Sequence, residues 1–349
     1  MTRGSVWGVV MIGALALGCS SPPSPPPPAK AKPKAATAEP AGVAKPAAPD
    51  DTPPAVEPAS DDAWPIAKPE LRRAPAVPDA VTVEEAGAEP RAALRFAPKP
   101  KATRSVGLKM TMEVAMTLGD KPIDPSVLPT VSVSMDVTPG AEADGATPYA
   151  FAVTSASRED LDGASERLKK AVDTAVEGMK DSSGRLTIDA QGRQVSADYG
   201  LPEVSTPGLR PSLAGFQQSF SQLFVVFPDE AVGVGARWAS TAHFEHSGIP
   251  IEQRSTYTLE KRDGDTLTLA VEFEQSATGD TESPAGVALE DTRFGGRGSG
   301  TLTVRLDSPF PVVAEAKSRS RVSSSVTMGG QAQPVEMDLL STLSIASAD

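Results

Sequence analysis

Alternation of apolar and polar residues is the feature that most constrains what this chain can fold into. In its longest run every second residue is apolar: Val106, Leu108, Met110, Met112, Val114, Met116 and Leu118. Successive side chains of a β-strand point to opposite faces of the sheet, so this run predicts a strand with one buried face and one solvent-exposed face. Shorter runs of the same kind at 131–137 and 149–153 predict two more strands.

The C-terminal part of the chain continues this pattern. Residues 251–259 and 267–273 alternate on either side of Asp263-Gly264, and an Asp-Gly pair between two alternating runs is a strong hairpin signal. Further strands are predicted at 302–306, 313–328 and 335–345, and a short hairpin at 186–199. Residues 278–300 are rich in Gly, Ser and charge, which predicts a long exposed loop.

Two stretches have helical periodicity instead. The first runs from Asp162, a residue favoured at the N-cap, to Gly184, and its apolar residues recur at steps of three and four. The second begins at Pro211, stops before Pro228 and is the most hydrophobic part of the chain. Its apolar side comprises Leu213, Phe216, Phe220, Leu223, Phe224 and Phe227. We expect the strands to bury their inner faces against this second helix.

Strands that precede, separate and follow two helices indicate an antiparallel α+β fold and not alternating βαβ units. Sequential hairpins of this length tend to curl. We therefore predict a single α+β domain at 79–349, in which one large curled antiparallel β-sheet, a half-barrel, wraps around the two helices.

The first residues have the character of a secretory signal peptide. Arg3 precedes an uncharged apolar run from Val6 to Leu17 that is too short to span a bilayer. The run ends in Ala16-Leu17-Gly18-Cys19-Ser20, and Cys19 is the single cysteine. This ending resembles the bacterial lipoprotein signal, with Ala16 and Leu17 in swapped order relative to its usual form.

The resemblance implies that residues 1–18 are removed and that Cys19 becomes an acylated N-terminus carrying chains such as palmitate. Ser20, with no Asp at that position, resembles lipoproteins that two-membrane bacteria sort to the outer membrane. The protein would then be an outer-membrane lipoprotein that faces the periplasm or the exterior and does not span the membrane. In the alternative interpretation, Cys19 is an incidental or buried residue.

Residues 19–78 differ in composition from the rest of the chain. Pro22–Pro78 holds half of the 34 prolines, no long apolar run and balanced charges. Such a segment cannot bury enough surface to offset its ordering entropy, so we expect a disordered Ala/Pro-rich linker. In the alternative, its Ala-Pro-Lys repeats contact the cell wall or another protein.

Removal of residues 1–18 takes away Arg3 and changes the formal net charge from -12 to -13, and this charge falls on the folded domain because the linker is balanced. An acidic domain repels nucleic acid and anionic lipid head groups, so both are excluded as main partners. The expected contact with a membrane is the N-terminal lipid anchor. The remaining candidate partners are an envelope protein and a hydrophobic ligand.

Two further resemblances concern the folded domain. The segment FPDEAVGVGARW, from Phe227 to Trp238, resembles a signature of exported bacterial proteins of unknown function, which reads Pro, two or three residues, Val-x-Val/Gly-Gly-x-x-Trp. The lipoprotein signal, Pro-rich linker, curled sheet and apolar helix together are similar to the lipoprotein-carrier half-barrel folds, whose cavity holds acyl chains. Neither resemblance implies catalytic residues.

A set of methionine and aromatic side chains forms the candidate ligand site. Flexible thioethers on one strand face, beside an aromatic helix, predict a cavity for an acyl chain or another apolar guest. The predicted lining comprises Met110, Met112, Met116, Met135, Phe216, Phe220, Phe224 and Trp238. Plain core packing and Cu(I) binding by the thioethers are the alternatives.

Nothing in the sequence has the pattern of a catalytic, metal or cofactor site. His243 and His246 are the only histidines, and on a strand they face opposite sides, which favours exposed polar residues over a metal site. The Gly-rich stretches at 233–235 and 295–300 open no helix of a βαβ unit, so they lack the context of a phosphate loop. An enzyme would need residues scattered along the sequence, since no GxSxG elbow is present. We therefore expect no enzyme, metal or cofactor.

The sequence thus favours a non-enzymatic, lipid-anchored envelope protein with a binding or structural role. The alternative is a carrier or sensor of a hydrophobic ligand, an acyl chain held between the sheet and the helix at 211–227.

Overall fold

The computed structural model describes residues 80–159, 166–180, 182–200, 224–246, 249–282, 288–328 and 330–348. The predicted signal peptide, Cys19 and the predicted linker lie outside these residues. Phe216 and Phe220 of the predicted ligand lining lie outside them as well.

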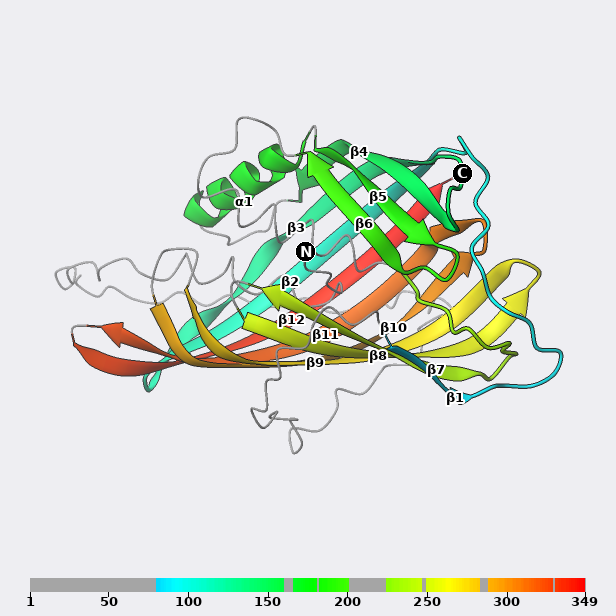
Figure 1. Ribbon diagram of the computed structural model, residues 1–349. Helices are drawn as coiled ribbons and strands as arrows, with labels where there is room; N and C mark the ends of the chain where they lie inside the picture. The colour runs from blue at the N-terminus through cyan, green and yellow to red at the C-terminus, as the bar shows by residue number, and fades with distance from the viewer. Residues whose placement is uncertain are drawn as a thin grey trace, which may run out of the picture. The chain divides into compact units, whose positions relative to one another are not determined.

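Twelve strands within the described residues form one antiparallel sheet (Figure 1). The N-terminal strands are β1 (Ala80–Glu85), β2 (Arg104–Leu118), β3 (Lys121–Pro139), β4 (Ala146–Arg158), β5 (Ser183–Asp189) and β6 (Gln194–Gly200). The C-terminal strands are β7 (Arg237–His246), β8 (Ile249–Asp263), β9 (Thr266–Glu282), β10 (Ala288–Arg305), β11 (Ser308–Met328) and β12 (Gln331–Ala348). Their order across the sheet is β1-β7-β8-β9-β10-β11-β12-β2-β3-β4-β5-β6. Two up-and-down meanders, β2–β6 and β7–β12, therefore meet where β12 pairs with β2.

Pairing brings apolar residues of neighbouring strands opposite one another. Met116 of β2 lies opposite Met337 of β12, and Tyr257 of β8 lies opposite Val271 of β9. Because side chains alternate along a strand, this register puts most apolar residues on one face, the inner face, and the charged residues on the other, the outer face. The strands predicted at 106–118, 251–259 and 267–273 are confirmed, as is the hairpin between the last two.

The described residues contain one helix, α1 (Glu166–Met179), which lies inside the helix predicted from Asp162 to Gly184. It packs on β4 and β3, with Val176 buried in the core of the sheet. Arg158 of β4 donates to both carboxylate oxygens of Asp173, at 2.5 and 3.2 Å, and these bonds lower the pKa of Asp173. Within the described part of the chain, no helix is both long enough and apolar enough to cross a membrane.

The predicted fold class, an α+β half-barrel around two helices, is wrong, because the described chain is almost entirely antiparallel sheet. Of the predicted second helix, residues 211–223 lie outside the described residues, and Phe224–Phe227 have no helical backbone. All four of these residues are buried, whereas an amphipathic helix buries only one side. Their backbone groups bond to other segments: Phe227 N–H donates to Gln191 O at 2.8 Å, and Val226 O accepts the Trp238 indole N–H at 2.9 Å.

The predicted loop at 278–300 is also wrong, because most of it belongs to β9 and β10, which pair with each other. Glycine ordinarily weakens a strand, but in β10 it allows a close approach from the neighbouring strand. A Cβ atom at Gly298 would overlap the ring of Phe273. The Gly-rich run is therefore an interior strand, and an aromatic ring from β9 fills the space above it.

The main hydrophobic core joins strands from both ends of the sheet. It contains Trp238 of β7 and Tyr257 of β8 together with Leu186 and Ile188 of β5. These strands lie near opposite edges, so the sheet must bend for their side chains to meet. Figure 1 shows this bend, with β5 and β6 at the top of the view and β7 and β8 at the bottom. The inner face of the sheet is therefore concave.

Candidate functional site

The described inner face carries three apolar clusters, and a polar band lies between the first two. The third and smallest cluster consists of Leu289, Val326 and Val335. The first cluster is the main core just described. The second cluster consists of Met112, Val114, Ile251, Ala277, Phe294, Val322, Met337 and Leu339, with Met116 and Leu128 packed against it. Between the strand ends, every described inner-face residue from β7 across to β2 is uncharged. This face is chemically suited to an uncharged molecule.

Segments outside the sheet close the first cluster. The ring of Phe227 lies 4.7 Å from that of Phe96 and 6.4 Å from that of Trp238, measured between centroids. Trp238 stacks on Tyr257 at 5.7 Å, and Phe224 meets Phe310 edge-on. Trp238 and Phe224, both predicted to line a ligand site, thus pack among the aromatic rings of the core.

The four predicted methionines all lie on the inner face, but their surroundings differ. Met135 is fully buried in the first cluster, and Met112 is buried in the second. Met110 and Met116 are partly exposed, although their strand β2 lies in the middle of the sheet. The structure therefore keeps three of the four methionines together on β2 and separates Met135 from them.

A polar band crosses the inner face from β7 to β12, between the first and second apolar clusters. Its members are Ser240, Gln253, Ser255, Gln275, Ser318, Ser320 and Ser341. Gln275 Nε2 donates to Gln253 Oε1 at 2.5 Å, and Gln253 Nε2 donates to Ser255 Oγ at 2.8 Å. We did not predict this band from the sequence. The signal that could have shown it is that Gln253 and Gln275 occupy apolar positions of their alternating runs.

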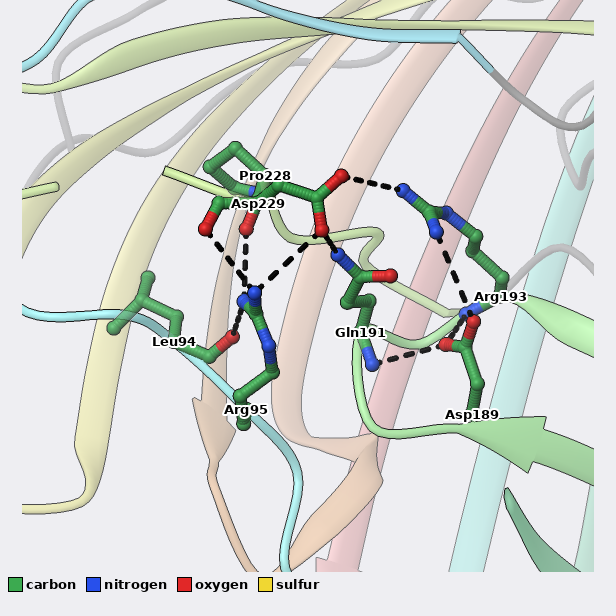
Figure 2. Close-up of polar contacts among 7 residues, drawn as sticks. All are labelled: Leu94, Arg95, Asp189, Gln191, Arg193, Pro228 and Asp229. Atoms are coloured by element: carbon green, nitrogen blue, oxygen red, sulfur yellow. Dashed lines mark hydrogen bonds and ion pairs between the residues drawn. The ribbon is translucent and has the colours of Figure 1, made fainter. Parts of the chain in front are cut away.

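A network of polar side chains fastens the segment that closes the first cluster (Figure 2). Arg95 donates to the backbone carbonyls of Pro228 and Asp229, at 2.9 and 3.1 Å. The Asp229 carboxylate accepts a hydrogen bond from Gln191 and lies 3.6 Å from Arg95 and 3.5 Å from Arg193. The network thus joins the segment before β7 to the turn between β5 and β6 and to the segment before β2.

A smaller polar group lies at one end of the sheet, where Arg104 begins β2. Arg104 and Arg305 both donate to Asp307 Oδ2, at 2.8 and 2.7 Å. Tyr149 lines the same shallow depression, and burial raises the pKa of its phenol. A phenol with a raised pKa stays protonated near neutral pH and cannot act as a general base. We assign no reaction to this group.

The outer face is charged and wet. Glu84 accepts hydrogen bonds from Arg237 and Arg254, at 2.8 and 2.5 Å, and these bonds lower the pKa of Glu84. Asp338 lies 3.3 Å from Arg319 and 3.3 Å from Arg321. Exposed ion pairs of this kind add little stability, so their main consequence is a hydrated surface.

The histidine that the structure describes in full belongs to this wet surface. His243 is exposed and shares a hydrogen bond of 3.2 Å with Glu252 across the β7–β8 pair. Among the described residues, no group of three or more His, Cys, Asp or Glu side chains is placed to hold a metal ion.

Comparison with protein families gives one partial match. A model described as "Family of unknown function (DUF6263)" matches residues 212–309, which is less than a third of the chain. The comparison with curated proteins found no match. The matched range includes the segment from Pro228 to Trp238 and the strands β7 to β10.

Two solved structures have a distant likeness to this chain. One is OmpF of Salmonella typhi in complex with daunomycin, with 8% identity and a TM-score of 0.23, covering 73% of this chain and 100% of that chain. The other is OpdK of Pseudomonas aeruginosa with vanillate, with 6% identity and a TM-score of 0.17, covering 70% of this chain and 98% of that chain. At such low TM-scores neither likeness supports a conclusion about the fold or the function of this protein.

Proposed function

We propose that this protein is a lipid-anchored lipoprotein of the bacterial cell envelope that binds an apolar ligand, such as an acyl chain, on the inner face of its sheet. The apolar ligand corresponds to the alternative that the sequence left open, a carrier or sensor of a hydrophobic molecule, and the lipid anchor corresponds to the favoured interpretation. The signal-like residues 1–18, followed by Cys19 and Ser20, support the lipid anchor and a location at the outer membrane.

Partial exposure of apolar side chains on the inner face is the observation that carries the binding proposal. Leu108, Met110 and Met116 of β2 are partly exposed, and so is Leu343 of the neighbouring strand β12. Both strands lie in the middle of the sheet, where inner faces are ordinarily covered. Each exposed CH₂ group forgoes about 0.8 kcal/mol of burial free energy. An apolar guest that covered these side chains would recover that free energy.

The chemistry of the face agrees with a guest held by apolar contact. Thioethers are flexible and polarisable, so Met110 and Met116 can adapt to a chain of variable shape. No charged side chain stands on the described inner face between the strand ends from β7 to β2, so the guest would be held without ion pairs. Binding should therefore depend on apolar area and respond weakly to salt.

Two substitutions on β2 test this proposal. We expect the double variant Met110→Gln, Met116→Gln to bind a fluorescent fatty acid at least about tenfold more weakly, a change of about 1.4 kcal/mol. The reason is that two carboxamides on the inner face lose apolar contact and must shed water. Fluorescence titration of the full-length protein measures the affinity.

Ala115→Gln is the matched control, because Ala115 is exposed on the outer face of the same strand. This control should bind like the unaltered protein. Lipid released by organic extraction of the purified protein provides an independent measurement. Equal uptake by both variants, or an unaltered protein that takes up no fatty acid and yields no extractable lipid, contradicts the proposal.

A further inference from the structure

Gln275 Oε1, on the inner face, is buried without a hydrogen-bond partner. Gln194 Oε1 and Asp307 Oδ1 are the other side-chain oxygens among the described residues that share this property. Gln275 is only 1% exposed, and its Nε2 atom is engaged by Gln253. A buried carbonyl without a partner costs about 1–3 kcal/mol, so proteins rarely retain one without a use for it.

An exchange of the amide oxygen and nitrogen does not remove the unpaired atom. If Gln275 and Gln253 both reversed their amides, Gln253 Nε2 would donate to Gln275, and the Ser255 hydroxyl would donate to Gln253. The Nε2 atom of Gln275 would then be the unpaired group. Ser255, Gln253 and Gln275 are linked by hydrogen bonds in either orientation, and one polar atom of the Gln275 amide has no partner in either.

A glycine on β10 lets this atom lie directly over the strand backbone. Gln275 pairs with Gly296, and Gly296 pairs with Ser320 on β11. The point that a Cβ atom of Gly296 would occupy lies 2.9 Å from Ser320 Oγ, 3.2 Å from Gln275 Oε1 and 3.2 Å from Phe294 Cζ. Any larger residue at 296 would press on both oxygens. Glycine thus leaves a carboxamide and a hydroxyl side by side over the backbone of β10.

The second cluster begins directly beside this polar pair. Phe294 is two residues from Gly296 on the same face, and it pairs with Val322 on β11. Val322 in turn pairs with Met337, and Met337 pairs with Met116. An apolar path therefore runs across four strands from the unpaired atom of Gln275 to the partly exposed Met116.

We propose that Gln275 and Ser320, over Gly296, bind the uncharged polar head of an amphipathic ligand whose apolar chain lies along the path from Phe294 to Met116. The head is an alcohol or a primary amide, since either can both donate and accept hydrogen bonds. A carboxylate or an ammonium group is disfavoured, because no described inner-face side chain here would neutralise it. This inference rests on the proposed function and specifies the ligand class for the same face.

Three ten-carbon probes separate the head group from the chain: 1-decanol, decanoate and decane. Affinities are measured by calorimetry on the full-length protein in lipid nanodiscs, with empty nanodiscs as the blank and at a pH where decanoate is ionised. We expect 1-decanol to bind about tenfold more tightly than decane, the value of one added hydrogen bond, and more tightly than decanoate.

Gln275→Met keeps the size of the side chain and removes its amide. In this variant the affinity for 1-decanol should fall to that for decane, while the affinity for decane should be unchanged. Gln331→Met, at the exposed start of β12, is the matched control and should keep the preference for the alcohol. If Gln275→Met does not fold, as judged by circular dichroism, Gly296→Ala tests the same site by placing a methyl group against both oxygens.

Each outcome decides between the two proposals. If Gln275→Met and Gly296→Ala still bind 1-decanol more tightly than decane, the proposed polar subsite is wrong and the proposal of apolar binding stands. Tighter binding of decanoate than of 1-decanol also overturns it. If none of the three probes binds the unaltered protein, the proposed function itself fails, and the subsite fails with it.

Discussion

Trp238 joins three parts of the chain through one indole ring. The ring stacks on Tyr257 in the neighbouring strand and approaches Phe227 in the segment before β7. Its N–H donates to Val226 O at 2.9 Å, which gives a buried carbonyl outside the sheet a partner. This single residue therefore anchors an irregular segment to the sheet by packing and by a hydrogen bond.

Trp238→Phe separates these two contributions. The phenyl ring keeps much of the aromatic packing but leaves the Val226 carbonyl without its donor. We expect a loss of about 1–3 kcal/mol in the free energy of unfolding, measured by urea denaturation. A loss below about 0.5 kcal/mol, the range of ordinary surface substitutions, would show that packing alone holds the segment.

At the scale of the element, β10 shows how a strand can be built from residues that disfavour strands. Its inner-face positions Gly296, Gly298 and Gly300 carry no side chains. The ring of Phe273, from β9, occupies the space over Gly298. Strand β10 is stabilised by two full partners, β9 and β11, and by this ring, which compensate for the poor intrinsic propensity of glycine.

Gly298→Ala tests this account of β10. The added methyl group would overlap the Phe273 ring and the backbone oxygen of Lys317, and we expect a loss of about 1–3 kcal/mol in unfolding free energy. Gly107→Ala on β2 is the control: its Cβ atom would have its nearest contact at 3.5 Å, so the change should be within about 0.5 kcal/mol.

Combining Gly298→Ala with Phe273→Leu removes the overlap with the ring and leaves the overlap with the Lys317 backbone oxygen. The double variant should therefore lose less stability than the sum of the two single variants. Strict additivity of the two losses would show that the ring and the glycine do not act together.

At the scale of the whole molecule, the pairing of β12 with β2 makes one sheet out of two meanders. It runs from Val335 opposite Leu118 to Ala348 opposite Ser105 without a bulge, and it joins residues more than two hundred positions apart. This pairing places Met337 beside Met116 and so completes the apolar path on the inner face. The candidate site therefore exists only when the C-terminal strand is in place.

The proposed anchor is tested on the same scale. We expect Cys19→Ser to abolish labelling by palmitate, to remove the sensitivity of processing to globomycin and to release the protein from the membrane fraction. Ser24→Ala, in the predicted linker, should retain all three properties. Because the described sheet contains none of these residues, its circular dichroism spectrum should be unchanged in both variants. Palmitate labelling that persists in Cys19→Ser contradicts the lipid anchor.

Alternation along single strands could be predicted from the sequence because it is a local property of an extended chain. It identified β2, β8, β9 and β12 and the inner-face positions of Met112 and Leu259. Helical periodicity failed at Phe224–Phe227, because several segments surround these residues and bury them on every side. The loop predicted from glycine content at 278–300 was likewise wrong for β10, because the Phe273 ring that packs over its glycines comes from another strand.

The sequence by itself determined which side of most strands would be apolar and where the chain would turn between β8 and β9. Only the tertiary structure decided the strand order, the meeting of β12 with β2, and the placement of Gln275 over Gly296. The physical reason is that side-chain alternation depends on neighbours in the chain. Strand pairing and the burial of an unpaired amide depend on residues that only the folded sheet brings together.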